Sequence, residues 1–209
     1  MPRHARSERE ALADLLQTLG PDAPTLNEGW STRDLAAHLV LRERRPDAAG
    51  GILLPPLRGY AERVRRHIAA RPWPQLVDQV RRPPAWSPVS NPLTDELANR
   101  LEFFVHHEDV RRARPDWLPR DLPVALHRAL WKRAAPLARV ALRRFPADVF
   151  VQAPGHGGLS VGRGGEPVRV VGAPGELVLF LTGRQRAARV QVDGSTPLAD
   201  RLRGARLGI

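Results

Sequence analysis

The spacing of apolar residues changes near residue 145, and this change is the strongest constraint that the sequence places on the fold. Before it, apolar residues recur with the period of an amphipathic helix. After it come short β-branched runs bounded by glycine. These runs cover residues 148–152, 168–171 and 189–192. The sequence therefore predicts a mainly α protein, with a helical bundle over residues 1–145 and a small α+β domain over residues 146–209.

Within the predicted bundle, helical patterns cover residues 7–19, 31–45, 57–70, 75–81, 91–113 and 123–144. The second pattern has the clearest beginning. Ser31 is a favourable N-cap, and Asp34 stands three residues later, where its carboxylate can reach back to the Ser31 amide. Trp30 is placed to pack on Leu35 as a hydrophobic staple. The first pattern opens with a similar capping box at residues 7–10.

Prolines mark the boundaries of other helices. Asn91 and Pro92 have the residue types favoured at the cap and first turn of the longest helix. Pro136 lies inside the last pattern, where it either kinks one helix or separates two. Beyond residue 145 we expect one short apolar helix over residues 175–181. The C-terminal part has about 60 residues, which is near the smallest size at which a domain folds independently. We therefore expect it to dock on the helical bundle and to close one side of a cleft in the bundle.

The composition limits the classes of function that this protein can have. The chain has no cysteine, so any metal must be held by histidine and carboxylate side chains. The net charge of +11 suggests a polyanionic partner. However, nearly all the basic residues are arginines spread along the chain. A GC-rich genome imposes this bias whatever the function, so we expect no specific nucleic-acid partner.

No apolar stretch is long enough to cross a bilayer and no signal peptide is visible, so we expect a cytoplasmic protein without a membrane partner.

Three residues form the candidate site: His38, Glu102 and His106. Glu102 and His106 are four residues apart on the longest helix, so their side chains share one face. His38 lies among leucines on the second helix. A buried carboxylate and imidazole are costly unless paired or metal-bound, and helical bundles build metal sites from such residues. The spacing is also typical of a solvated ion pair, so by itself it leaves both interpretations open.

If these residues bind a metal, they leave at least one coordination position for water or substrate, as in catalytic sites. Nitrogen and oxygen ligands favour zinc, with nickel, iron or manganese as alternatives. Asp34 lies one turn before His38 and could orient its second ring nitrogen.

The other histidines have weaker contexts. Glu108 and Asp109 precede arginines on the same helix face, so we assign them, with His107, to the structural framework. His156 lies in a glycine-rich turn that is either a connection between strands or a loop facing the substrate. This segment lacks the lysine and serine of a phosphate loop. No catalytic role is expected for His4, His67 and His127.

Three segments carry a resemblance to a known family: Gly29–Leu39 (GWSTRDLAAHL), Asn99–Arg112 (NRLEFFVHHEDVRR) and Gly175–Arg184 (GELVLFLTGR). They resemble the mycothiol-dependent maleylpyruvate isomerase superfamily, whose N-terminal part is a DinB-like four-helix bundle. The chain looks most similar to an actinobacterial branch described only as metal-binding. The resemblance implies that His38, Glu102 and His106 bind a divalent metal, usually zinc, and that Arg184 helps to hold an anionic substrate.

Two functions follow from the resemblance and the residues together. The first is a metal-dependent enzyme that uses a low-molecular-weight thiol, mycothiol, for isomerisation or transfer on a small anionic electrophile. The second is a non-catalytic metal-binding protein that serves as a sensor, carrier or interaction module. Either could be a monomer or a homodimer.

Overall fold

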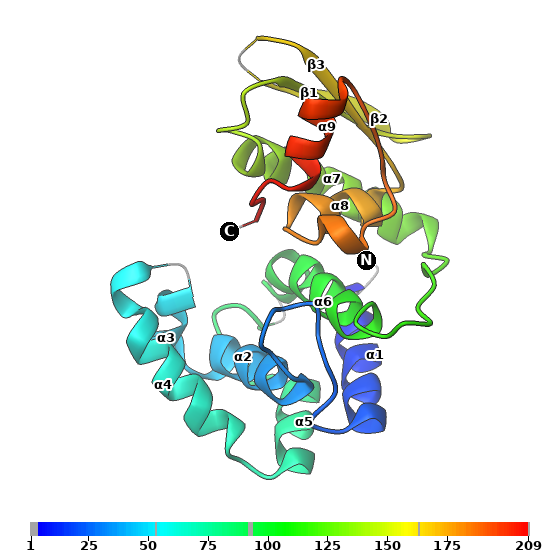
Figure 1. Cartoon of the computed structure of the whole chain (residues 1–209). Helices are drawn as coiled ribbons and strands as arrows, with labels where there is room; N and C mark the ends of the chain where they lie inside the picture. Colours follow the sequence, from blue (N-terminus) through cyan, green and yellow to red (C-terminus); the bar gives the residue numbers. More distant parts are fainter. Residues whose placement is uncertain (1–3, 53, 92–93, 163, 209) are drawn as a thin grey trace. The chain divides into compact units, whose positions relative to one another are not determined.

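A computed structural model describes residues 4–52, 54–91, 94–162 and 164–208 of the chain, which forms two compact units (Figure 1). The first unit comprises residues 1–119 and the second residues 120–209. The sequence placed this division at residue 145, because every helical pattern before the strands was assigned to the bundle. In the structure, the last of these helices packs with the sheet-containing part, so the division falls before that helix.

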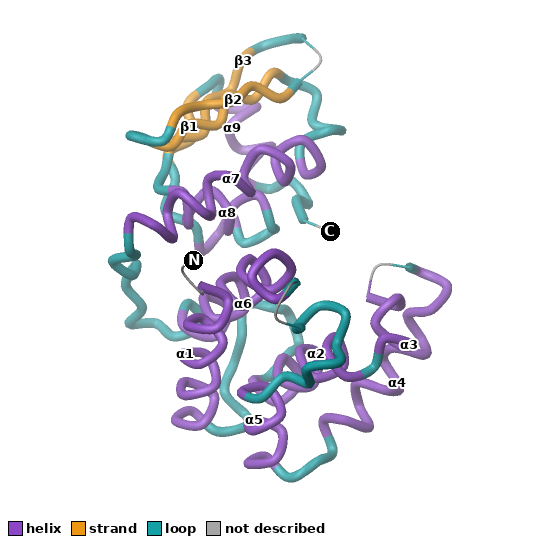
Figure 2. Tube along the Cα trace, turned by 180° about the vertical axis from the view of Figure 1, so that it is seen from behind, coloured by secondary structure: helices purple, strands orange, loops and turns teal. Residues whose placement is uncertain are grey.

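The first unit is built from helices. They are α1 (His4–Leu19), α2 (Thr32–Arg44), α3 (Pro46–Ala49), η1 (Gly50–Ile52), η2 (Pro55–Leu57), α4 (Arg58–Ala69), α5 (Trp73–Arg81) and α6 (Asp95–Arg111). Figures 1 and 2 show α1 next to α6, and α2 next to α4. Apolar residues from α1, α2, α4, α5 and α6 form one buried core, as the helical period of the sequence predicts.

The beginning of α2 is as the sequence predicts. The Ser31 hydroxyl accepts a hydrogen bond from the Asp34 amide, and the Asp34 carboxylate accepts one from the Ser31 amide at 3.0 Å. Trp30 packs against the core cluster that contains Leu35. This capping box fixes the first turn of α2 and therefore the direction in which its later residues point.

Two other predicted helix beginnings differ from the structure. α1 begins at His4, so Ser7 lies inside the helix, and the Ala5 amide donates to Glu96 of α6 at 2.9 Å. A tertiary contact thus replaces the predicted capping box at residues 7–10. α6 begins at Asp95, while the Asn91 side chain accepts from the Thr94 amide in the preceding turn. Pro92 lies outside the described residues.

In its described residues, the second unit combines a four-stranded sheet with three α-helices and one 3-10 helix: α7 (Val124–Ala141), β1 (Asp148–Ala153), β2 (Gly157–Val161), β3 (Pro167–Val171), α8 (Pro174–Leu181), η3 (Gln185–Ala187), β4 (Gln191–Asp193) and α9 (Thr196–Arg203). The strand order is β2-β1-β3-β4, with β1 and β3 parallel and the outer pairs antiparallel. Alternate residues of β1 and β3 are buried in one cluster with residues of α7 and α8. α7 continues through Pro136 as one helix.

Two elements of this unit, β2 and α9, were not predicted from the sequence. β2 runs through the glycine-rich segment and pairs with β1, with Leu159 opposite Val151. Only Leu159 and Val161 alternate as half-buried apolar side chains, and with two glycines before them this pattern is too short to mark a strand. α9 follows β4 and buries Ala199 and Leu202. Among the described residues, no helix combines the length and apolar character that crossing a bilayer requires.

Candidate metal centre

The fold of the first unit brings His38, Glu102 and His106 together. His38 lies on α2, and Glu102 and His106 lie one turn apart on α6. Glu102 Oε1 is 3.2 Å from Nε2 of His38 and 3.2 Å from Nε2 of His106. Each residue offers one ligand atom, and these three atoms all lie within 4.8 Å of one another. The two histidine rings meet edge to face, with centroids 5.2 Å apart.

The protonation of the three side chains is set by burial and by their contacts. Burial opposes ionisation of Glu102, but hydrogen bonds from His106 and His38 hold its pKa well below the usual range. Burial lowers the pKa of His38. Burial also acts to lower the pKa of His106, yet Asp109 and Glu102 raise it to about 9. The cluster therefore combines an ionised carboxylate with one neutral and one protonated imidazole near neutral pH.

Asp109 lies directly behind His106. Its Oδ2 atom is 2.9 Å from Nδ1 of His106, on the opposite side of the ring from Glu102. Asp109 is fully buried, and Asn27 donates to the same oxygen at 3.3 Å. From the sequence, Asp109 was expected to belong to the framework because arginines follow it. The i,i+3 spacing from His106 is the signal that could have indicated this contact.

Asp34 has a different role from the expected one. Its carboxylate accepts hydrogen bonds from Ser31 and Arg65, and within the described residues it makes none with His38. The reason is local, because a residue in the third position of a helix points back toward the N-cap. The prediction that Asp34 orients His38 is therefore wrong.

Arg42 is a further residue of the site that was not predicted from the sequence. It lies one turn after His38 on α2, and its Nε atom is 3.6 Å from Glu102 Oε1. The guanidinium also donates to the Asn99 side chain and, at 3.1 Å, to the carbonyl of Ala98. Arg42 thus holds α6 near Glu102 and contributes to keeping that carboxylate ionised.

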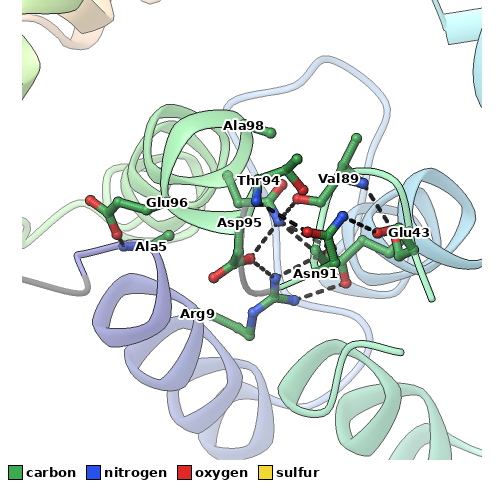
Figure 3. Close-up of polar contacts among 12 residues, drawn as sticks. Ala5, Arg9, Glu43, Val89, Asn91, Thr94, Asp95, Glu96 and Ala98 are labelled. Atoms are coloured by element: carbon green, nitrogen blue, oxygen red, sulfur yellow. Dashed lines mark hydrogen bonds and ion pairs between the residues drawn. The ribbon is translucent and has the colours of Figure 1, made fainter. Parts of the chain in front are cut away.

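A buried polar network supports the same two helices. Figure 3 shows Arg9 of α1 between Glu43 and Asp95, with nitrogen–oxygen distances of 2.6 Å and 3.0 Å. Glu43 also accepts hydrogen bonds from Ser90 and Asn99. Since Asn99 accepts from Arg42, the network continues to the edge of the candidate site. It ties α1, α2 and α6 together at fixed positions along their axes.

The remaining predicted residues lie elsewhere. His107 pairs with Glu8 of α1 at 2.9 Å, and Glu108 pairs with Arg112 at 2.5 Å, both in the buried framework as expected. Arg184 belongs to the second unit, where its guanidinium donates to the Thr182 carbonyl at 2.6 Å. Its binding of a substrate anion stays a prediction. His127 and His156 also lie in the second unit, with ring centroids 6.1 Å apart.

Comparison with known proteins identifies the fold. No protein-family model and no curated protein matches the sequence. Two solved structures match, the crystal structure of the mycothiol-dependent maleylpyruvate isomerase and that of a histidine-to-alanine mutant of it. Both are 18% identical to this chain, with TM-scores of 0.53 and 0.52, and the matches cover 92% of this chain and 90% of theirs. The chain therefore shares the fold of that isomerase.

Proposed function

We propose that this protein is a divalent-metal-dependent enzyme in which His38, Glu102 and His106 bind the metal. The convergence of three ligand atoms within 4.8 Å carries the proposal. Two ligands about 2.1 Å from a tetrahedral ion lie about 3.4 Å apart. Glu102 Oε1 lies 3.2 Å from Nε2 of each histidine, which is close to that separation. The donor set fits a divalent ion, with zinc the first candidate and nickel, iron and manganese the alternatives.

The reaction that we propose is isomerisation or transfer on a small electrophile, with mycothiol or a similar low-molecular-weight thiol as cosubstrate. The fold shared with a mycothiol-dependent isomerase supports it. A divalent metal, when bound, lowers the pKa of a coordinated thiol and so supplies a nucleophile at neutral pH. The chain has no cysteine, so the thiol would come from solution.

The chain's own residues have distinct tasks in this scheme. Asp109 accepts the Nδ1 proton of His106, so that once the Nε2 proton has left, the lone pair of Nε2 would face Glu102 and the metal position. Arg42 stabilises the ionised form of Glu102, the form that binds a cation. His38 is held neutral by burial, and a neutral imidazole is the form that acts as a ligand.

Elemental analysis tests the metal centre. Untagged protein purified without chelator or added metal should contain near one equivalent of a divalent metal, and His38→Ala should contain none. His67→Ala is the matched control, because His67 is an exposed histidine on α4 and its replacement should leave the metal content unchanged. Absence of metal from the wild type, even after reconstitution with zinc, would contradict the proposal.

A second experiment tests whether a thiol binds to the metal in this site. Cobalt-substituted protein should develop a thiolate-to-cobalt absorption band in the near ultraviolet when mycothiol is added, because a thiol that enters the open position binds as the thiolate. Adding the S-methylated thiol should produce no such band. A metal-replete protein that gives no band with any thiol would favour the non-catalytic metal-binding function.

A further inference from the structure

A cavity of about 390 Å³ lies in the first unit next to His38. Its walls come from α2, η1, α4 and the residue before the α2 cap. Most of the lining surface is apolar and includes Leu41, Ile52 and Ala61. The volume lies in the range of small-molecule sites, and an apolar lining with few polar groups is typical of them.

Glycine at position 51 allows η1 to approach α4 closely enough to form one wall. A Cβ atom at Gly51 would lie 2.6 Å from the Cβ of Ala61 and 2.5 Å from the carbonyl oxygen of Leu57. Any larger residue would therefore push η1 away from α4. The cavity wall thus depends on a close contact between these two segments.

His38 connects the cavity to the candidate metal centre. Its ring lines the cavity, while its Nε2 atom is directed at Glu102. Trp30 also lines the cavity, with its ring centroid 5.3 Å from that of His38. A ligand in the cavity would therefore contact the side chain that we propose as a metal ligand.

Most of the charge around the cavity is already neutralised. Arg65 donates to both oxygens of Glu62, at 2.7 Å and 2.8 Å, and to Asp34. Its guanidinium also stacks over Trp30, 5.2 Å from the ring centroid. Arg65 is therefore committed to the protein and forms a rigid wall rather than a free cation.

Arg58 differs from Arg65. It lines the cavity, it is exposed, and its side chain forms no hydrogen bond or ion pair with any other residue that the structure describes. A guanidinium in this position can offer two parallel hydrogen bonds to a carboxylate. Among the described residues that line it, the cavity thus presents one available cation, Arg58, beside an apolar surface.

We infer that this cavity binds the electrophilic substrate, and that the substrate is a compact monocarboxylate with a flat apolar body. The apolar part would pack on Leu41, Ile52 and Trp30, and the carboxylate would bind Arg58. A dicarboxylate would leave its second charge against apolar surface, which is costly. The inference rests on the proposed function for the role of His38 as a metal ligand beside the bound substrate.

A polyhydroxylated thiol suits this cavity poorly. Its hydroxyl groups would need hydrogen-bond partners, and Glu62 and Arg65 are already paired with each other. We therefore place the apolar carboxylate, rather than a thiol of that kind, within this cavity.

Ligand-detected NMR titration of the full-length protein with cinnamate tests the inference. Carboxylates also bind zinc directly, so the decisive titration uses metal-free protein. Cinnamate should bind, and the uncharged cinnamamide and the dianion maleate should each bind at least about tenfold more weakly. Equal binding of cinnamate and cinnamamide, or no binding of cinnamate, would overturn the inference.

Two variants locate the binding. Arg58→Ala changes an exposed side chain and should weaken cinnamate binding at least about tenfold. Arg63→Ala is the matched control, because Arg63 is an exposed arginine of α4 that does not line the cavity. Ile52→Phe should fill the apolar part and abolish binding, with folding checked by circular dichroism. Unchanged affinity in Arg58→Ala or in folded Ile52→Phe would contradict the assignment.

Zinc content, measured on the same samples, separates this inference from the proposed function. Zinc-replete protein that does not bind cinnamate when stripped of metal would overturn the cavity assignment and leave the metal centre intact. Failure of the protein to bind zinc would instead overturn the assignment of the metal centre. Cinnamate binding that depends on Arg58 would in that case still support the cavity as a carboxylate site.

Discussion

The Oδ2 atom of Asp109 lies 2.9 Å from Nδ1 of His106, and both side chains are buried on α6. One ring nitrogen of His106 is thus held by a carboxylate, while the other faces Glu102 at 3.2 Å. Metal-binding histidines commonly have such a carboxylate partner, which fixes the tautomer and the orientation of the ring. The contact gives His106 the orientation that a ligand needs before any metal is present.

We expect Asp109→Asn to weaken zinc binding about 10- to 100-fold without abolishing it, because the amide holds the ring less firmly and adds no negative charge. Competition with a chromophoric chelator measures the affinity. Asp22→Asn, a change of an exposed aspartate in the same unit, should bind zinc like the wild type. Equal affinities of the Asp109 variant and the wild type would show that this carboxylate does not support the site.

Zinc should stabilise the folded protein only when the ligand set is complete. At a free zinc concentration 100 times the Kd, mass action adds about 2.7 kcal/mol to the free energy of unfolding. Thermal melts with and without zinc should therefore differ for the wild type and for His67→Ala. For Glu102→Gln the two melts should coincide. A zinc-induced rise in the Tm of Glu102→Gln equal to that of the wild type would place the metal elsewhere.

Removing the charge of Glu43 should strongly destabilise the protein. Arg9 and Glu43 are 2% and 1% exposed, so Glu43→Gln leaves a buried guanidinium without its main counter-charge. We expect a loss of about 3–5 kcal/mol in the free energy of unfolding, measured by urea denaturation and far-ultraviolet circular dichroism.

Glu10→Gln is the control for the buried pair, because Glu10 pairs with Arg6 on the surface of α1, where both side chains are at least half exposed. An exposed pair of this kind contributes about 0–1 kcal/mol. Similar small losses in the two variants would mean that the Glu43 charge is not needed to hold the helices.

Asp34 should stabilise the protein at neutral pH and lose this effect in acid. Burial acts to raise its pKa, but hydrogen bonds from Arg65 and Ser31 lower it below the ordinary value of 3.8. Ionised Asp34 therefore stabilises the folded state above that value, and the contribution is lost as the pH falls through the lower pKa of the folded state.

The wild type should accordingly exceed Asp34→Asn in free energy of unfolding by about 1 kcal/mol at pH 7, the usual contribution of a helix cap. Urea denaturation between pH 7 and pH 3 should show the two proteins converging as the pH falls. Asp116→Asn, at an exposed position, should differ little from the wild type throughout. A difference that grows on acidification would contradict the assigned sign.

Local signals in the sequence were sufficient where a few neighbouring residues decide the structure. The capping box of Ser31 and Asp34 predicts the start of α2, because it depends only on residues three apart. The i,i+4 spacing of Glu102 and His106 predicts their shared face for the same reason. The strand β2 was missed because its pairing with β1, rather than its own side chains, makes it a strand.

By itself, the sequence determined the helical character of the first unit, the change to a strand-containing C-terminal part and the residue types able to hold a metal. Only the tertiary structure decided that α7 packs with the sheet, that Asp109 rather than Asp34 supports a histidine, and that Arg42 lies beside Glu102. Helix periodicity records which face of a helix is buried, but not which other helix covers it. The partner of a buried polar group is chosen by packing between segments that are distant in the chain.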